Sequence, residues 1–207
     1  MKPLRQYIRQ ILLTEGMKTP IDLPEDAYVW IADQGSRFYV IVDAPSWHSS
    51  AKLSLRKYPH GCSGAWEVVK AVAPSGWGPL LYDIAMEYVG GEGIMCDRSS
   101  VSKEAAHIWD FYLNSRPDVK AAQLDYNRQP FITPEDESDD CPGNTFTKHD
   151  HDEIEKAEPE SYGHFYPTRW PAQQKPWKDH WSTKKYIKLG GTPIIDQLND
   201  MNILEYK

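Results

Sequence analysis

The sequence predicts an α/β protein, with a central mixed sheet (α+β in character) flanked by helices and an irregular C-terminal extension rich in proline and aromatic residues. The first half contains several short runs of β-branched and aromatic residues separated by turn signals. Those runs then alternate with two segments whose apolar residues recur at helical spacing. Hydrophobic residues make up 40% and charged residues 26% of the 207 positions, as in a globular protein with a core.

We divide the chain into three parts. Residues 1–16 carry Leu4, Ile8, Ile11 and Leu12 at helical spacing among arginines, which predicts a short amphipathic helix that packs on the domain. The continuous apolar stretch of a signal peptide is absent. A transit peptide or a membrane-surface helix is the alternative. Residues 17–126 form the predicted core, and residues 127–207 the extension.

The core elements follow from local pattern. Residues 26–44 read as two strands joined by a turn at 33–36, and residues 65–73 as a further strand. Between them, the alternation around Leu53 and Leu55 predicts another strand, which breaks at 59–61. Apolar positions then predict a helix over 80–89, a short buried strand over 93–97 and a second helix over 100–115, with Ser100 or Ser102 as its N-cap. Residues 119–125 predict a final strand, so that the sheet would be built within about the first 125 residues.

The extension begins with a strongly acidic stretch. Residues 133–160 hold eleven acidic residues against two lysines, a composition typical of a solvated loop. Residues 162–181 interleave lysine and arginine with tryptophan, and 192–207 could close the fold with a helix through Ile194, Ile195, Leu198 and Met201.

Composition also bounds the function. The net charge of −7 argues against a general nucleic-acid coat protein, although a local basic patch stays compatible with it. Three widely spaced cysteines, Cys62, Cys96 and Cys141, suggest no disulfide framework and favour a reducing compartment. No apolar run approaches the roughly 18 residues of a membrane span. We therefore expect a cytoplasmic protein with no membrane partner.

The junction from 68 to 89 raises the main functional question. A β-branched run ends at Pro74, Gly76 and Gly78 follow, and a helix pattern begins at once. Helix N-termini carry unpaired N–H groups and a positive dipole end, and glycine lets a phosphate approach the backbone. The same pattern is compatible with a simple tight turn.

The order from 67 to 114, "EVVKAVAP-SGWG-PLLYDIAMEYV" followed by "GIMCDRSSVSKEAAHIWDFYLN", resembles the core of the GNAT N-acetyltransferase superfamily. The resemblance covers roughly residues 26–125 and includes Ser102, Ala105, Trp109 and Tyr112, similar to an Asn-x-x-Ala…Tyr pattern. The chain departs from the family at Ala73, where Gln or Arg is usual, and at Pro79, where the loop is one residue shorter. Its texture also resembles small proteins of tailed bacteriophages, which would put it in the host cytoplasm.

The resemblance implies acetyl-CoA as cosubstrate and transfer of an acetyl group to an amine of a protein or small molecule. It implies a cofactor surface made by the strand end, the glycine loop and the helix start: Val72, Ala73, Ser75, Gly76, Trp77, Gly78 and Leu80. It also implies Glu67 as the general base and Tyr112, or less favourably Tyr82, as the proton donor to the thiolate. The alternative is a catalytically inactive GNAT-like binding protein, or a phage accessory or virion protein.

Other candidate features are weaker. Cys141, His149, Asp150, His151 and Asp152 are metal-ligand types, but their spacing matches no known zinc site, so we assign no metal. Asp97 and Arg98 could orient a substrate or cap the following helix, and Cys96 is expected to be inert. Trp170, Trp177 and Trp181 among cations are also compatible with single-stranded nucleic acid, but we expect no nucleic-acid partner, and the aromatic extension is a candidate surface for a protein partner.

Overall fold

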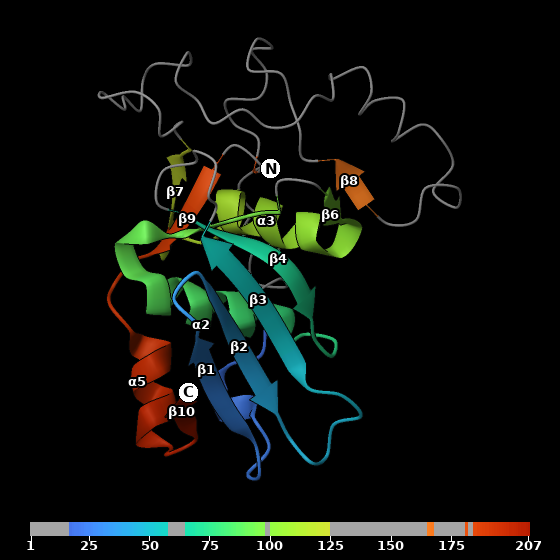
Figure 1. Cartoon of the computed structure of the whole chain (residues 1–207), viewed down its shortest axis with the longest axis vertical. Helices are drawn as coiled ribbons and strands as arrows, with labels where there is room; N and C mark the ends of the chain where they lie inside the picture. Colours follow the sequence, from blue (N-terminus) through green and yellow to red (C-terminus); the bar gives the residue numbers. More distant parts are fainter. Residues whose placement is uncertain (1–16, 58–64, 98–99, 125–164, 168–180, 182–183) are drawn as a thin grey trace, which may run out of the picture. The chain divides into compact units, whose positions relative to one another are not determined.

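The computed structural model describes residues 17–57, 65–97, 100–124, 165–167, 181 and 184–207. The described helices and strands run in chain order (Figure 1): η1 (Pro20–Asp22), β1 (Tyr28–Asp33), β2 (Arg37–Asp43), β3 (Ala51–Lys57), β4 (Trp66–Val72), α2 (Gly78–Val89), η2 (Gly90–Glu92), β5 (Ile94–Met95), β6 (Ser100–Ser102), α3 (Lys103–Ser115), β7 (Val119–Gln123), β8 (Phe165–Pro167), β9 (Lys184–Lys188), α5 (Pro193–Asp200) and β10 (Leu204–Tyr206).

The protein is an α/β protein built on a mixed sheet, as the sequence predicts. Eight strands are hydrogen-bonded in the order β10-β1-β2-β3-β4-β5-β9-β7, and β6 pairs separately with β8. The strand pairs β10–β1 and β4–β5 are parallel, whereas β1–β2, β5–β9 and β9–β7 are antiparallel. The predicted β-α-β-α-β order is present as β4, α2, β5, α3 and β7, with the three-residue β6 added before α3.

The chain divides into two compact units. Unit 1 comprises Met1–Ser54, Lys70–Tyr88 and Gly190–Lys207, and unit 2 comprises Leu55–Val69 and Val89–Leu189. Strands β3 and β4 contribute residues to both units.

In unit 1, strict alternation along β1 and β2 separates a buried face from an outer face. Val29 and Ile31 of β1 and Phe38, Val40 and Val42 of β2 are buried. Helix α2 packs against this buried face: the Tyr88 ring lies 5.1 Å from that of Phe38, and the Tyr88 hydroxyl donates to Asp33 at 2.5 Å. Burial, together with this bond to a carboxylate, raises the pKa of Tyr88 to about 12.

The β1–β2 turn has the geometry that its residues predict. The Gly35 N–H donates to the Asp33 carboxylate at 2.7 Å, and the Gln34 N–H donates to the Arg37 carbonyl at 2.8 Å. Gly35 has a φ of +77°, which glycine adopts without the steric cost that other residues meet. The predicted turn at 33–36 is therefore confirmed.

Unit 1 closes with the C-terminal segment. Ile195 and Leu198 of α5 are buried at the spacing the sequence predicts, whereas Met201 lies just past the helix and is exposed. The chain then forms β10, which runs parallel to β1 with Val29 opposite Leu204 and Ile31 opposite Tyr206.

In unit 2, β9 lies between β5 and β7 and carries the aromatic centre of the core. Tyr186 of β9 is buried, with its ring 5.1 Å from Trp109 and 6.1 Å from Tyr112 of α3. Burial, with the nearby Cys96 and Asp110, raises the pKa of Tyr186 well above its usual value. Helix α3 begins where predicted, because the Ser102 hydroxyl accepts from the Ala105 N–H at 3.2 Å.

Two strands of the eight-stranded sheet, β9 and β10, lie outside the sequence prediction, as do β6 and β8 of the separate pair. The sheet was expected within about the first 125 residues, but β9 and β10 come from the last 24 and join β5, β7 and β1. Consequently β7 is not the final strand. No helix in the described part of the chain is long and apolar enough to cross a bilayer.

Candidate functional site

The predicted cofactor surface belongs to unit 1 and starts at the exposed end of β4. Strand β4 has seven residues, but it pairs with β5 only at Trp66 and Glu67. Its last three residues, Lys70, Ala71 and Val72, are exposed, and the Val72 side chain keeps 46% of its surface accessible. An exposed valine at the end of a strand leaves apolar surface that a ligand can cover.

The turn after β4 is compact. The Trp77 N–H donates to the Pro74 carbonyl at 3.1 Å, and the Lys18 N–H donates to the Gly76 carbonyl at 3.4 Å. Gly76 has a φ of +83°, so the first glycine of the motif is needed for the backbone conformation. The Trp77 amide is thus engaged within the turn rather than directed to a ligand.

Helix α2 begins at Gly78, immediately after the turn. Pro79 is its second residue and has no N–H, which removes one of the donors that a helix N-terminus normally offers. Trp77 and Leu80 are buried, and the Trp77 ring packs on Trp47 at 5.0 Å and 50°. Of the seven predicted cofactor residues, these two therefore support the loop from inside, whereas Val72 and Ser75 are exposed.

Glu67, the predicted general base, belongs to unit 2. Its side chain is fully buried, and its carboxylate accepts a hydrogen bond and ion pair from the Arg56 Nε at 2.6 Å. Arg56 is itself 38% exposed, so the pair connects a buried carboxylate to a partly solvated guanidinium. The neighbouring Trp66 donates from its indole nitrogen to Glu92 at 2.5 Å, with Lys57 5.1 Å from the Trp66 ring.

Tyr112, the predicted proton donor, is also in unit 2 and is buried. Its ring lies 6.3 Å from Trp109 and 6.1 Å from Phe111, and the Arg116 guanidinium lies 5.3 Å from its centre. Tyr82, the other candidate, is buried on α2 in unit 1. Both tyrosines thus have core environments.

The remaining predicted features are only partly described. Cys96 is a buried thiol, and Asp97 is half-buried. Trp181 is buried, and its carbonyl accepts from the Tyr186 hydroxyl at 3.0 Å, so it is not a free stacking surface. Outside the described residues lie Arg98, Trp170, Trp177, the helix predicted for 1–16, and the cluster from Cys141 to Asp152.

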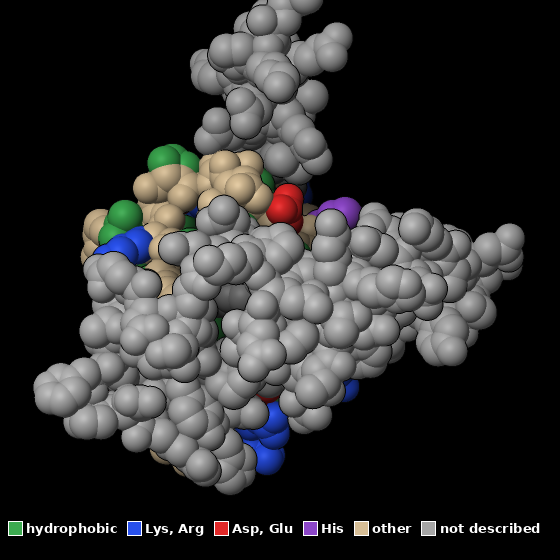
Figure 2. All heavy atoms as spheres, turned by 90° about the horizontal axis from the view of Figure 1, so that it is seen from above, with side chains coloured by type: hydrophobic (Ala, Val, Ile, Leu, Met, Phe, Trp, Pro, Cys, Tyr) green, Lys and Arg blue, Asp and Glu red, His purple; other side chains and the backbone are tan. Residues whose placement is uncertain are grey.

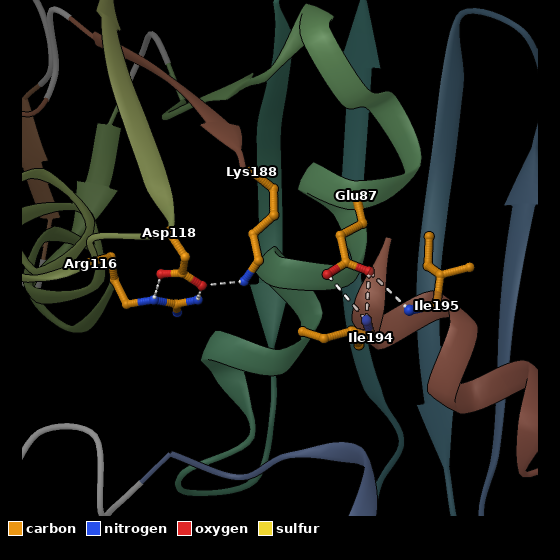
Figure 3. Close-up of polar contacts among 6 residues, drawn as sticks. All are labelled: Glu87, Arg116, Asp118, Lys188, Ile194 and Ile195. Carbon is orange, nitrogen blue, oxygen red and sulfur yellow. Dashed lines mark hydrogen bonds and ion pairs between the residues drawn. The ribbon is translucent and has the colours of Figure 1, made fainter. Parts of the chain in front are cut away.

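Two polar clusters were not predicted from the sequence (Figure 3). In unit 1, the buried Glu87 of α2 accepts from the backbone N–H groups of Ile194 and Ile195 at the start of α5, at 2.9 Å each. In unit 2, Arg116 and Lys188 each donate to Asp118 at 2.7 Å, and the Arg116 hydrogen bonds are the main cause of a strongly lowered pKa of Asp118. The sequence signal for the first cluster was Glu87 itself, an acidic residue among the buried positions of the predicted helix.

Described acidic and histidine side chains reach the surface on the face drawn in Figure 2. Comparison of the chain with protein-family models, with curated proteins and with solved structures gave no match.

Proposed function

We propose that this protein binds acetyl-CoA on the surface formed by the end of β4 and the start of α2, and transfers the acetyl group to an amine of a protein or small molecule. The observation that carries the proposal is the exposed end of β4, which extends beyond the pairing of this strand with β5. Five of the seven residues of this strand extend beyond its pairing with β5, and the exposed part leads directly into the glycine turn and α2. The resemblance to N-acetyltransferases implies a strand end that is free of its parallel neighbour just before a helix N-terminus, and the end of β4 extends beyond the two residues of β5.

The chemistry requires few groups. The amine nitrogen attacks the thioester carbonyl, a C–N bond forms, the C–S bond breaks, and the thiolate takes up a proton. A base has to remove a proton from the ammonium or from the attacking amine, and we assign this role to Glu67. We assign the proton donor to Tyr112. Backbone N–H groups at the start of α2 and the dipole of that helix favour the negative charge of the cofactor.

A second function is favoured by one specific observation. Glu67 is fully buried and bonded to Arg56, so it can act as a base only if the pair opens. With Pro79 lacking an N–H, this geometry also suits a catalytically inactive GNAT-like protein that binds a partner, such as a phage accessory or virion protein. The two functions differ in turnover, whereas either can retain cofactor affinity.

The test separates binding from turnover. Calorimetry with acetyl-CoA measures affinity, and mass spectrometry of lysine peptides and polyamines incubated with acetyl-CoA measures acetylation. Val72→Asp should weaken the binding of acetyl-CoA by about tenfold or more, because it places a carboxylate where the cofactor would contact the strand end. Leu189→Asp is the matched control, since Leu189 is also an apolar side chain with 46% of its surface exposed.

Glu67→Gln and Tyr112→Phe address catalysis. If the assigned roles are right, each lowers the rate of acetylation by about a hundredfold while the affinity for acetyl-CoA is retained. Binding without acetylation of any amine would favour the inactive binding protein. Absence of acetyl-CoA binding at millimolar concentration would refute the enzyme.

A further inference from the structure

The outer face of the β1–β2 hairpin in unit 1 carries aromatic side chains that α2 does not cover. Because Val29, Ile31, Phe38, Val40 and Val42 point to the buried face, the alternate residues lie on the opposite side. We name this surface the outer aromatic face and define it by Tyr28 and Trp30 of β1 and Tyr39 and Ile41 of β2. Trp30 is the direct cross-strand neighbour of Ile41, whereas Tyr28 lies opposite Asp43 and Tyr39 lies opposite Ala32.

Two of the rings on this face, Tyr28 and Trp30, are stacked. Tyr28 and Trp30 lie with their ring centres 5.2 Å apart and their planes at 15°. Tyr28 is the most exposed of these aromatic residues, at 42%, and Trp30 and Tyr39 are partly exposed. A stack that ends in an exposed ring can be continued by another flat group.

Two lysines border the same rings. The Lys207 ammonium lies 4.6 Å from the centre of Trp30, and the Lys52 ammonium lies 4.5 Å from the centre of Tyr39. Arg37, at the start of β2, is exposed on the same hairpin. Two carboxylates share this face: Asp43 lies opposite Tyr28 and accepts from its hydroxyl at 3.5 Å, and Glu205 lies opposite Trp30 and 3.4 Å from Lys207. Asp43 also accepts from Ser50 at 3.0 Å and from the Ala44 N–H at 3.1 Å.

We propose that the outer aromatic face binds single-stranded nucleic acid, with bases stacking on Tyr28 and its neighbours and phosphates contacting Lys52, Lys207 and Arg37. Aromatic side chains on an open sheet, bordered by cations, are the combination that holds unpaired bases and their backbone. An acidic peptide would use the cations but leave the exposed ring without a flat partner. This proposal is separate from acetyl transfer and concerns different residues.

The sequence is compatible with nucleic-acid binding only through a local basic patch. The net charge of −7 disfavours broad nucleic-acid coating, and the candidate tryptophans were sought in the extension, where Trp181 is in fact buried. Arg37 of β2, Lys52 of β3 and Lys207 after β10 place three cations at this face against the two carboxylates Asp43 and Glu205, a local excess that the overall charge does not reveal. We therefore expect weak, salt-sensitive binding to a short stretch of nucleotides rather than coating.

The experiment is a fluorescence-anisotropy titration of labelled oligothymidylate and oligouridylate of about 12 nucleotides with the full chain. With three phosphate contacts, the logarithm of the affinity should fall with the logarithm of salt concentration with a slope of about −2. Trp30→Ala or Tyr28→Ala should weaken binding by about tenfold. The double variant Lys52→Gln, Lys207→Gln should reduce the slope to about −0.7.

Two control variants distinguish this face from a general surface effect. Tyr206→Ala removes a more exposed ring that packs toward Tyr88, and Lys120→Gln removes an exposed lysine of β7; both should leave binding unchanged. Circular dichroism checks folding, and if Trp30→Ala is unfolded the lysine double variant decides. Absence of binding to both oligonucleotides, equal competition by polyglutamate, or binding unaffected by the ring and lysine variants would overturn the proposal.

Discussion

The contact between Glu87 and the start of α5 permits a sharp test of how unit 1 is held together. Helix N-caps are normally supplied by the residue just before the helix, whose side chain accepts from the second or third helical N–H. In α5 that residue is Thr192, but its hydroxyl donates to Asp196 at 3.1 Å and makes no cap hydrogen bond. The N–H groups of Ile194 and Ile195 instead donate to the carboxylate of Glu87, which lies 107 residues before Ile194 in the chain.

The expected magnitude follows from these two hydrogen bonds. Both end on a buried carboxylate, so Glu87→Ala leaves two backbone donors without their acceptor, at about 1–3 kcal/mol each. We expect the free energy of unfolding to fall by about 2–6 kcal/mol. Glu87→Gln keeps one carbonyl acceptor but loses the charge and its favourable interaction with the helix dipole, which predicts a loss of about 1–2 kcal/mol.

The assay combines denaturant unfolding with amide hydrogen exchange. In Glu87→Gln the Ile194 and Ile195 amides should exchange faster than in the parent protein, while the amides of α3 keep their protection. The matched control is Glu205→Gln, since Glu205 is 66% exposed and pairs only at the surface with Lys207; its effect should stay within about 0.5 kcal/mol. Unchanged protection of Ile194 and Ile195 in Glu87→Gln would refute the cap.

Two further predictions concern unit 2. Gly93→Ala should destabilise the protein by more than about 2 kcal/mol, because φ is +71° and the added Cβ would lie 2.8 Å from the Tyr186 carbonyl; Gly91→Ala, with open space around it, is the control in the same thermal melt. The lowered pKa of Asp118 means that its folded form stays ionised at a pH where the unfolded form is protonated, so its contribution is present above about pH 4 and is lost as the pH falls below that value. Asp118→Asn should therefore flatten the decline of stability measured by denaturant titration between about pH 4 and pH 2, and an unchanged decline would contradict this origin.

Much of the fold could be predicted because its signals are local. The Asp33-to-Arg37 turn depends on a glycine and on an aspartate that accepts from it, and α3 depends on Ser102 as its cap. Strand β9 was missed because "KKYIK" has one large buried residue between lysines, and its strand state comes from pairing with β5 and β7. Strand β10 has three residues and depends on its parallel partner β1 in the same way.

The candidate site was harder to predict than the fold for a related reason. Pattern identified the strand end, the glycine turn and the start of α2, but not which side chains would be buried. Trp77 was assigned to the cofactor and packs on Trp47, which lies thirty residues earlier. Glu67 was assigned as a base on a strand, and its ion pair with Arg56 of β3 is a cross-strand contact that spacing along one strand does not reveal.

Glu87 and Glu67 are both buried, but only for Glu87 does the stability of the fold explain why a carboxylate is needed. Replacement of Glu87 would leave backbone amides without an acceptor, so the fold itself requires a carboxylate or a similar acceptor at that position. Replacement of Glu67 by an apolar residue would leave Arg56, which is partly exposed and can be hydrated by water. Since buried ion pairs are often no more stabilising than apolar residues of the same size, stability alone gives little reason for Glu67. That asymmetry makes Glu67 the residue at which the proposed acetyl transfer is tested most directly.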